Sequence, residues 1–319
     1  MRRIRRFLSH WQNWLALIMV FGFIFVAIAA PVISEEDPKT PGPFKRVGRV
    51  TEGRPLPPDE KAVLGMLPRG QDVLHPLVWG ARGALQFGLL VTFFTAVFGI
   101  LYGALAGLMG GRAGGLMMNV ADSFLAVPII AGVVFLQQLW ASTIEAMGGM
   151  YFEHPTLGLI IEVAGPTTPI QWVLERFSPL MLSLIILSWM PYARMVHSTV
   201  ILLVRTDFIQ AARALGGSSW WVIRKHLIPN SLAPALVLAA RDIGGVVLLQ
   251  ATFTFIGLGG ESIWGEMLAQ GRGWVIGPGG SLLTYWWVFL PPTIAVMLFG
   301  IAWNMLGDGL NDALDPQAI

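Results

Sequence analysis

The chain has 319 residues, of which 55% are hydrophobic and only 13% are charged. Soluble domains average about 25% charged residues, so this composition excludes an ordinary soluble protein and points to lipid as the surrounding solvent. The net charge of +2 is too small to indicate a nucleic-acid partner, and the lack of cysteine excludes disulfides, thiolate metal sites and cysteine nucleophiles.

Six apolar segments are each long enough to cross a bilayer, which takes about 20 residues of helix. They fall at 13–33, 84–109, 116–140, 179–203, 233–257 and 284–306. The first follows a basic start and resembles a signal peptide, but it is longer than the roughly 7–15 apolar residues of a signal-peptide core. We therefore expect an all-α integral membrane protein with six transmembrane helices.

Basic residues predict the orientation of these spans. Arginines precede the first span and loop 204–232 is also basic, so both are expected in the cytoplasm. Loop 34–79 is equally rich in basic residues, but acidic residues match them and the loop is long and rich in proline. The predicted parts are a cytoplasmic N-tail (1–12), a first span (13–33), an extracytoplasmic loop (34–79), a five-span core (80–306) and a cytoplasmic C-tail (307–319). No role is predicted for a second outer loop, 141–178.

Small residues in the second span predict close helix packing. Gly99, Gly103 and Gly107 recur every four residues and therefore share one face of a helix. Glycines at this spacing let two helix backbones approach each other inside a membrane. The pattern predicts a packed bundle and carries no information about a substrate.

Charged and polar side chains inside the spans are candidates for contact with a transported solute. Arg241 and Asp242 are adjacent, so they point in different directions on a helix and do not simply pair with each other. Either they face a translocation path or a partner subunit, or they pair with a neighbouring helix or reach the membrane surface. Asp122 and Gln137 are weaker candidates, since polar residues in spans more often join helices.

Motifs for catalysis and metal binding are missing from the sequence. No lysine follows a glycine, as a phosphate-binding loop requires, and no Gly-x-Ser-x-Gly elbow is present. The five histidines stand apart from one another, and His226 is interpreted as a solvated loop residue. We expect no catalytic residue and no metal site, so any ATP hydrolysis must occur on another chain.

Residues 208–230 predict a helix, a glycine turn and a second helix. The helix formers and the turn are Ala211, Ala212, Ala214, Leu215, Gly216 and Gly217. Ser218 or Ser219 can cap the second helix, which runs toward Pro229. A compact basic knob of this kind suits a protein partner or the anionic inner leaflet, and an amphipathic loop lying on the surface is equally compatible.

The same segment resembles the coupling loop of binding-protein-dependent importer permeases, Glu-Ala-Ala-x-x-x-Gly followed by Ile-x-Leu-Pro. Here Gln210-Ala211-Ala212 precedes Gly216 at the family spacing, and His226-Leu227-Ile228-Pro229 ends the motif. Gln210 replaces the glutamate, and His226 and Ile228 replace the usual aliphatic pair. The resemblance assigns coupling to an ATPase to Gln210, Ala211, Ala212, Ala214, Leu215, Gly216 and Pro229.

Other segments resemble the dipeptide/oligopeptide/nickel branch of that family over about 13–316. They are 13–17, 30–31, 37–38, 71–74, 80–82, 255–259, 264–265 and 306–316. The departures are Gly65-Met66-Leu67 in place of Gly-Thr-Asp, the longer loop 141–178, and Arg241-Asp242. Gln250 stands where a glutamate is common and joins Arg241, Asp242, Asp122 and Gln137 as a translocation-path candidate.

The resemblance implies a type I ABC importer permease in a prokaryotic cytoplasmic membrane. A second six-span permease, usually non-identical, two ATP-binding cassette subunits that carry ATP and Mg, and an external binding protein are the implied partners. No cofactor is expected on this chain. Peptides are the implied cargo, with nickel, opines, glutathione and sugars left open. An ion-gradient-driven transporter and an ABC-like sensing or assembly subunit are the alternatives.

Overall fold

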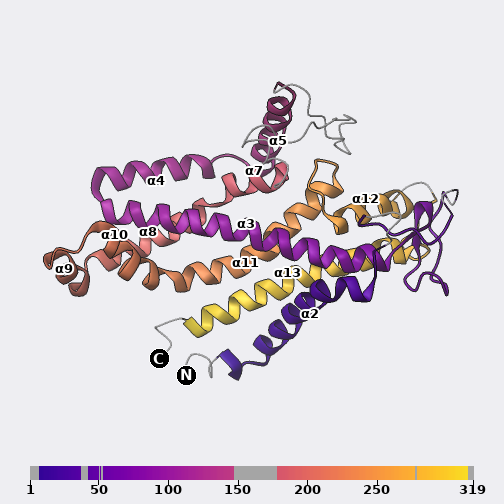
Figure 1. The fold of residues 1–319 in the computed structure, drawn as a ribbon, viewed down its shortest axis with the longest axis horizontal. Helices are drawn as coiled ribbons and strands as arrows, with labels where there is room; N and C mark the ends of the chain where they lie inside the picture. The colour runs from indigo at the N-terminus through magenta and orange to yellow at the C-terminus, as the bar shows by residue number, and fades with distance from the viewer. Residues whose placement is uncertain are drawn as a thin grey trace.

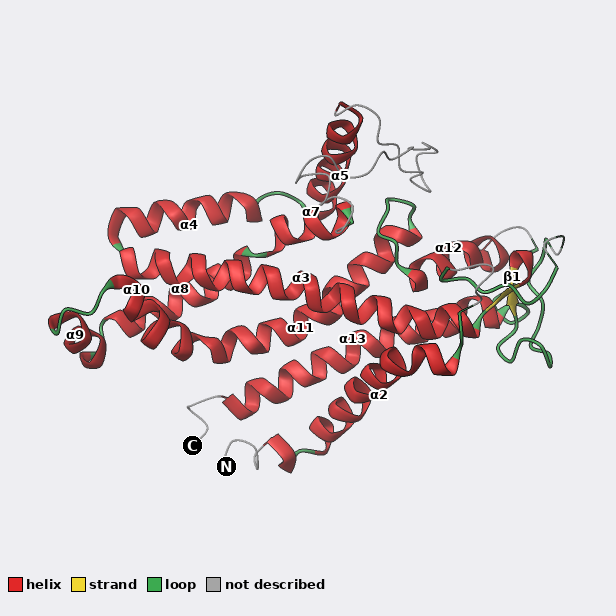
Figure 2. Cartoon of the chain, in the orientation of Figure 1, coloured by secondary structure: helices red, strands yellow, loops and turns green. Residues whose placement is uncertain are grey.

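The computed structural model describes residues 7–36, 42–49, 51, 53–146, 178–276 and 279–314. In these ranges the chain is mainly helical, and most helices run along the long axis of an elongated molecule (Figure 1). The predicted outer loop 141–178 lies mostly outside the described residues. A small antiparallel ribbon at one end provides the strands (Figure 2).

The long helices correspond to the predicted spans. They are α2 (Trp11–Ile33), α3 (Leu74–Met109), α7 (Pro179–Ser188) continued by α8 (Met190–Val204), α11 (Ile228–Phe255) and α13 (Trp286–Leu314). The shorter elements are α4 (Gly111–Leu125), α5 (Ile129–Ala146), α9 (Asp207–Ala214), α10 (Ser219–Val222), a π-helical segment (Ile223–Leu227), α12 (Ile263–Ile276), β1 (Met66–Leu67), a 3-10 turn (Pro68–Gly70) and β2 (Gln71–Asp72). Five helices in the described ranges can cross a membrane, or six if the bent pair α4–α5 counts as one span.

The third predicted span is a bent pair of helices in the structure. Segment 116–140 divides between α4 and α5, whose axes differ by 89°, and α5 stands out from the bundle in Figure 1. Pro128 lies at the break and has no backbone N–H to donate. Proline also keeps the preceding residue out of helical conformation, so the chain turns there and restarts as α5.

Two helices extend beyond the boundaries predicted from hydropathy. Helix α3 begins at Leu74, because the Asp72 carboxylate accepts a hydrogen bond from the backbone N–H of His75 over 3.0 Å and so caps the first turn. Segment 34–79 is therefore not only an irregular loop, since it holds the β1–β2 ribbon and the start of α3. Helix α13 continues to Leu314, inside the predicted C-tail.

The predicted glycine face packs α3 against α8. A Cβ at Gly99 would lie 2.6 Å from the Cβ of Tyr192, one at Gly103 would lie 2.9 Å from the Cα of Ala193, and one at Gly107 would lie 2.6 Å from Val200. No real side chain tolerates such contacts. The glycines thus allow the two backbones to touch, as the spacing predicted.

A second core joins α2, α3, α12 and α13 around Trp264. Its indole packs edge-on against Phe23 and Phe299, with ring centroids 6.2 and 5.9 Å away. The indole N–H donates to the backbone carbonyl of Leu77 over 2.9 Å. Gly80 has no side chain, and a Cβ there would overlap this indole. The Trp264 side chain therefore connects α12 to the bundle.

We predict that Gly103→Ala destabilises the chain by about 1–3 kcal/mol, because the added methyl overlaps the backbone of Ala193 and forces the helices apart. The measurement is the thermal unfolding midpoint of the purified protein in a fixed detergent.

Gly300→Ala is the matched control, since a Cβ at this helical glycine meets nothing within 4 Å. Alanine is the better helix former, so the control is expected to be neutral or slightly stabilising. Equal midpoints for the two variants would contradict the proposed α3–α8 contact.

Candidate functional site

Residues 207–222, which we call the α9–α10 knob, form the predicted helix–turn–helix. Helix α9 ends in a Schellman motif: the backbone N–H of Gly217 donates to the carbonyl of Ala212 (3.0 Å), and that of Gly216 to Arg213 (2.9 Å). Gly216 adopts the left-handed conformation with φ of 84° that this motif requires. The prediction that Gly216-Gly217 ends the first helix is confirmed.

The second half of the knob begins at the predicted cap and then departs from the prediction. The Ser218 hydroxyl accepts a hydrogen bond from the backbone N–H of Trp221 over 3.3 Å. The helix does not stop near Pro229. It passes through a π-helical segment, where the N–H of Ile228 donates to the carbonyl of Ile223, and continues into α11. The Asn230 amide and Ser231 hydroxyl donate to the carbonyls of His226 and Leu227 (2.6 and 2.9 Å), so the wider turn leaves these carbonyls satisfied.

The knob presents apolar side chains at its surface. Leu215 is 89% exposed and Trp220 is 62% exposed, with Phe208 and Trp221 partly exposed beside them. Among the motif residues, Gln210, Ala211, Ala214 and Pro229 face outward. Ala212 points inward instead, next to the buried Ile209.

His226 is not the solvated loop residue predicted from its basic neighbours. Its ring packs against Trp221, with centroids 4.9 Å apart, and lies 6.0 Å from the ring of Phe208. Its Nε2 atom is buried without a hydrogen-bond partner. The aromatic neighbours come from α9 and α10, which the sequence did not place beside it.

Arg241 and Asp242 face different helices. The Arg241 guanidinium donates to the Asp308 carboxylate of α13 over 2.6 Å. Asp242 points the other way, toward the phenol of Tyr192 on α8. The expectation that these adjacent charges do not pair with each other agrees with this arrangement. A neighbouring helix supplies the partner of Arg241, whereas the hydroxyl of Tyr192 makes no hydrogen bond among the described residues.

Asp122 also has a charged neighbour, which the sequence analysis missed. The Nε atom of Arg194 on α8 lies 3.2 Å from Oδ1 of Asp122 on α4. Arg194 lies inside the predicted span 179–203, and the rule that singled out Arg241 applies equally to it. Tyr192 is two residues from Arg194, about 3 Å along the helix axis, so these polar contacts lie in one layer of the bundle.

The two glutamine candidates differ in their surroundings. Gln250 is buried, and its side-chain amide donates to the carbonyl of Gly260 over 2.9 Å, so it holds the segment that follows α11. Gln137 on α5 is half-buried, and its Nε2 has no partner among the described residues. Neither lies in the layer that contains Arg194 and Arg241.

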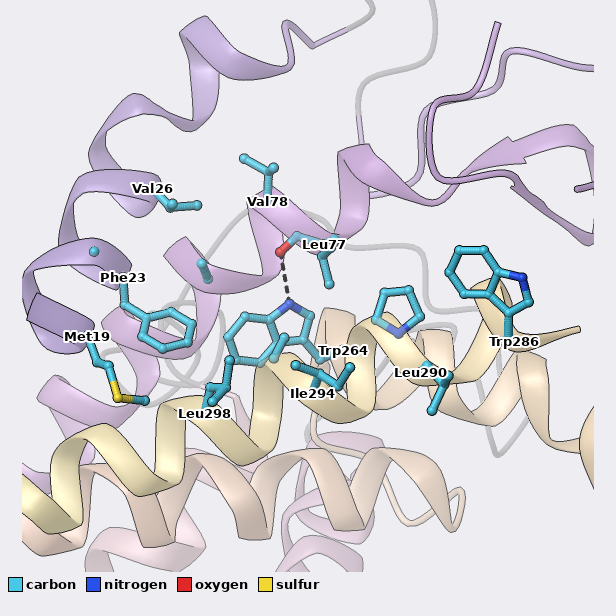
Figure 3. Close-up of a pocket in the computed structure, with 14 residues that line it drawn as sticks. Met19, Phe23, Val26, Leu77, Val78, Trp264, Trp286, Leu290, Ile294 and Leu298 are labelled. Atoms are coloured by element: carbon cyan, nitrogen blue, oxygen red, sulfur yellow. Dashed lines mark hydrogen bonds between the residues drawn. The ribbon is translucent and has the colours of Figure 1, made fainter. Parts of the chain in front are cut away.

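The best-defined pocket is apolar and lies apart from these charges. It has a volume of about 670 Å³ and is an open groove lined by α2, α3, α12 and α13 (Figure 3). The labelled side chains around it are Met19, Phe23, Val26, Leu77, Val78, Trp264, Trp286, Leu290, Ile294 and Leu298. The Trp264 indole N–H is already bonded to Leu77. Apart from the indole N–H of Trp286, these side chains offer no polar partner to the charged ends of a solute. Within the described ranges, no three metal-ligating side chains come together.

Known proteins resemble this chain over most of its length. Residues 99–319 match the family model described as binding-protein-dependent transport system inner membrane component. The dipeptide transport system permease protein of Alkalihalophilus pseudofirmus is 29% identical, over 94% of this chain and 84% of its own length. The di/tripeptide permease protein of Pseudomonas aeruginosa is 29% identical (94% and 86%). The glutathione permease protein of Pectobacterium atrosepticum is 26% identical (98% and 89%).

We predict that the Arg241–Asp308 pair contributes little to stability, with a coupling energy of about 0.5–1 kcal/mol, because both side chains are partly exposed. The measurement is a double-mutant cycle of Arg241→Gln and Asp308→Asn, read as unfolding midpoints in detergent. Strictly additive effects would show that the pair contributes nothing.

Proposed function

The chain belongs to the family of binding-protein-dependent transport system inner membrane components, and from this premise we propose that it forms half of the translocation path of an ATP-driven importer for peptides or related small solutes. The other half is a second six-span permease, which we propose to be non-identical. Two ATPase subunits carry ATP and Mg, and an extracytoplasmic binding protein delivers the cargo.

The observation that carries this proposal is the exposed apolar surface of the α9–α10 knob. Leu215 and Trp220 project from the end of the molecule, where no other described element covers them. Large apolar side chains left in water mark protein-interaction surfaces. We assign contact with an ATPase to Gln210, Ala211, Ala214 and Leu215, and assign the shape of the knob to Ala212, Gly216 and Pro229.

A continuous helix connects the knob to the charged layer. From Ser219 the chain stays helical through the π-helical segment and α11 to Phe255. Movement of a docked knob would therefore shift Arg241 and Asp242 directly. We propose that closure of the ATPases moves the knob in this way and exchanges inward-open and outward-open states.

Orientation follows from the ends of the bundle. The start of α2 and the end of α13 lie beside each other, since a Cβ at Gly309 would meet Asn13 and Phe7. Both ends point toward the side that carries α9 and α10 (Figure 1). Because the N-terminal arginines and loop 204–232 are basic, we place this side and both termini in the cytoplasm. The β1–β2 ribbon and α12 then face the binding protein.

The cargo class is inferred from the relatives. Three of the relatives are named for transport of dipeptides, di/tripeptides and glutathione. We therefore propose that the cargo is a small peptide. Family membership sets aside the ion-gradient alternative. A sensing or assembly subunit would bind ATPases without uptake, which the following experiment measures.

We predict that Leu215→Glu lowers the co-purification of ATPase subunits and ATP-driven uptake about tenfold, because a charge replaces an exposed apolar contact. The tagged chain is purified in mild detergent from native membranes, and partners are identified by mass spectrometry. Uptake of a labelled dipeptide is measured in the same cells.

Val63→Glu is the control. Like Leu215, Val63 is an exposed aliphatic side chain (69%), but it lies in segment 34–79, away from the knob. It is expected to retain ATPase co-purification, the property that distinguishes the two variants. Normal uptake by Leu215→Glu would remove the knob as the docking surface, and a wild-type chain that binds ATPases without uptake would support the sensing alternative.

A further inference from the structure

A polar stripe runs along the outward faces of α4 and α8. Asn119, Asp122 and Ser123 follow one another at helical spacing on α4, and Arg194 and Ser198 do so on α8. In this chain 43% of the Asp122 side chain and 61% of the Arg194 side chain are exposed. The two helices contact each other, so the stripes form one polar surface.

This surface is unsuited to lipid. A charged side chain near the centre of a bilayer costs about 2.5–3.5 kcal/mol on insertion scales. On α4 the exposed Leu116 and Val120 lie on the far side of Asn119 from Asp122 and suit the hydrocarbon instead, with Ser123 at the border between the two stripes. When a membrane-crossing helix exposes one apolar stripe and one polar stripe, the polar stripe faces water or another subunit.

The ion pair on this surface is incompletely bonded. Asp122 and Arg194 approach to 3.2 Å through Oδ1 and Nε, but Oδ1 accepts no hydrogen bond of good geometry. Among the described residues, the two terminal nitrogens of Arg194 have no partner. A guanidinium normally binds a carboxylate through two parallel N–H groups, so this one retains donors for another carboxylate. The second oxygen of Asp122 likewise remains for an ammonium group.

We propose that Asp122 and Arg194 form a dipolar binding site for a zwitterionic solute, with Arg194 binding the carboxylate of a peptide and Asp122 its ammonium group. This assignment rests on the proposed function, because it places the site on the translocation path. The pair is neutral overall, which matches a solute that carries both charges. Dipeptides, tripeptides and glutathione, for which the relatives are named, all carry an ammonium and a carboxylate group.

Single-cysteine labelling tests the surface, because the chain has no cysteine of its own. The assembled complex is placed in nanodiscs without nucleotide, and the labelling rate of Asn119→Cys by a water-soluble maleimide is followed on this chain. Val120→Cys on the neighbouring apolar stripe of α4 is the control. We expect Asn119→Cys to react about tenfold faster, and millimolar dialanine to slow it about twofold, as expected when the ligand concentration is near the dissociation constant of a weak site.

The charged pair is tested in the same assay. Dialanine blocked at both ends as N-acetyl-dialanine amide is expected to give no protection, and Arg194→Gln or Asp122→Asn is expected to abolish the protection by free dialanine. In the wild-type background these variants are expected to reduce dipeptide uptake about tenfold, the loss of one charged hydrogen bond. Arg194→Lys, which keeps the charge, is expected to recover part of it.

Three outcomes would overturn the proposal. They are equal labelling of the two cysteines, equal protection by free and blocked dialanine, and occlusion of Asn119→Cys by the second permease whether or not dipeptide is present. The last would make the stripe an interface between subunits. Protection from labelling measures binding of dialanine, so it tests the binding site even if the wild-type protein shows no uptake. A failure of wild-type uptake would count against the proposed function alone.

Discussion

Direct contact between the backbones of α3 and α8 is the constraint on which the bundle depends. Lipid is as apolar as the side chains, so helices in a membrane associate through close packing rather than through the hydrophobic effect. Gly99, Gly103 and Gly107 remove the side chains that would keep α3 and α8 apart. Helix α3 also contacts α2, α4, α7, α11, α12 and α13. Its position against α8 therefore influences where the other helices can lie.

The two ion pairs of the charged layer are partly exposed, and each one joins a different pair of helices. Asp122 and Arg194 connect α4 to α8, and Arg241 and Asp308 connect α11 to α13, while Asp242 of α11 lies on the side of Tyr192 of α8. Adjacent charges on one helix serve two neighbours since their directions differ by about 100°. The knob is continuous with α11, so the layer is connected to the surface where an ATPase is proposed to dock.

The apolar pocket and the polar stripe divide the surface of the molecule by chemistry. The pocket around Trp264 lies toward the end with α12 and presents almost only hydrocarbon. The stripe on α4 and α8 presents hydroxyl, amide and charged groups. A peptide brings at least two charges across the membrane, and burying them without partners is costly. The path is therefore proposed along the stripe, and the pocket remains part of the apolar exterior.

The sequence by itself determined the properties that depend on neighbouring residues along the chain. Residence in a membrane followed from composition, the long helices from apolar length, and the end of α9 at Gly216 and the cap at Ser218 from local backbone chemistry. Resemblance to a permease family was likewise readable from short motifs. What only the tertiary structure decided were the partners of polar groups and the side of a helix that is covered. Arg241 meets Asp308, 67 residues away, Ala212 turns inward while Ala211 faces out, and α5 leaves the line of α4 at Pro128. These outcomes depend on which helices pack together, and hydropathy and local propensity do not encode that choice.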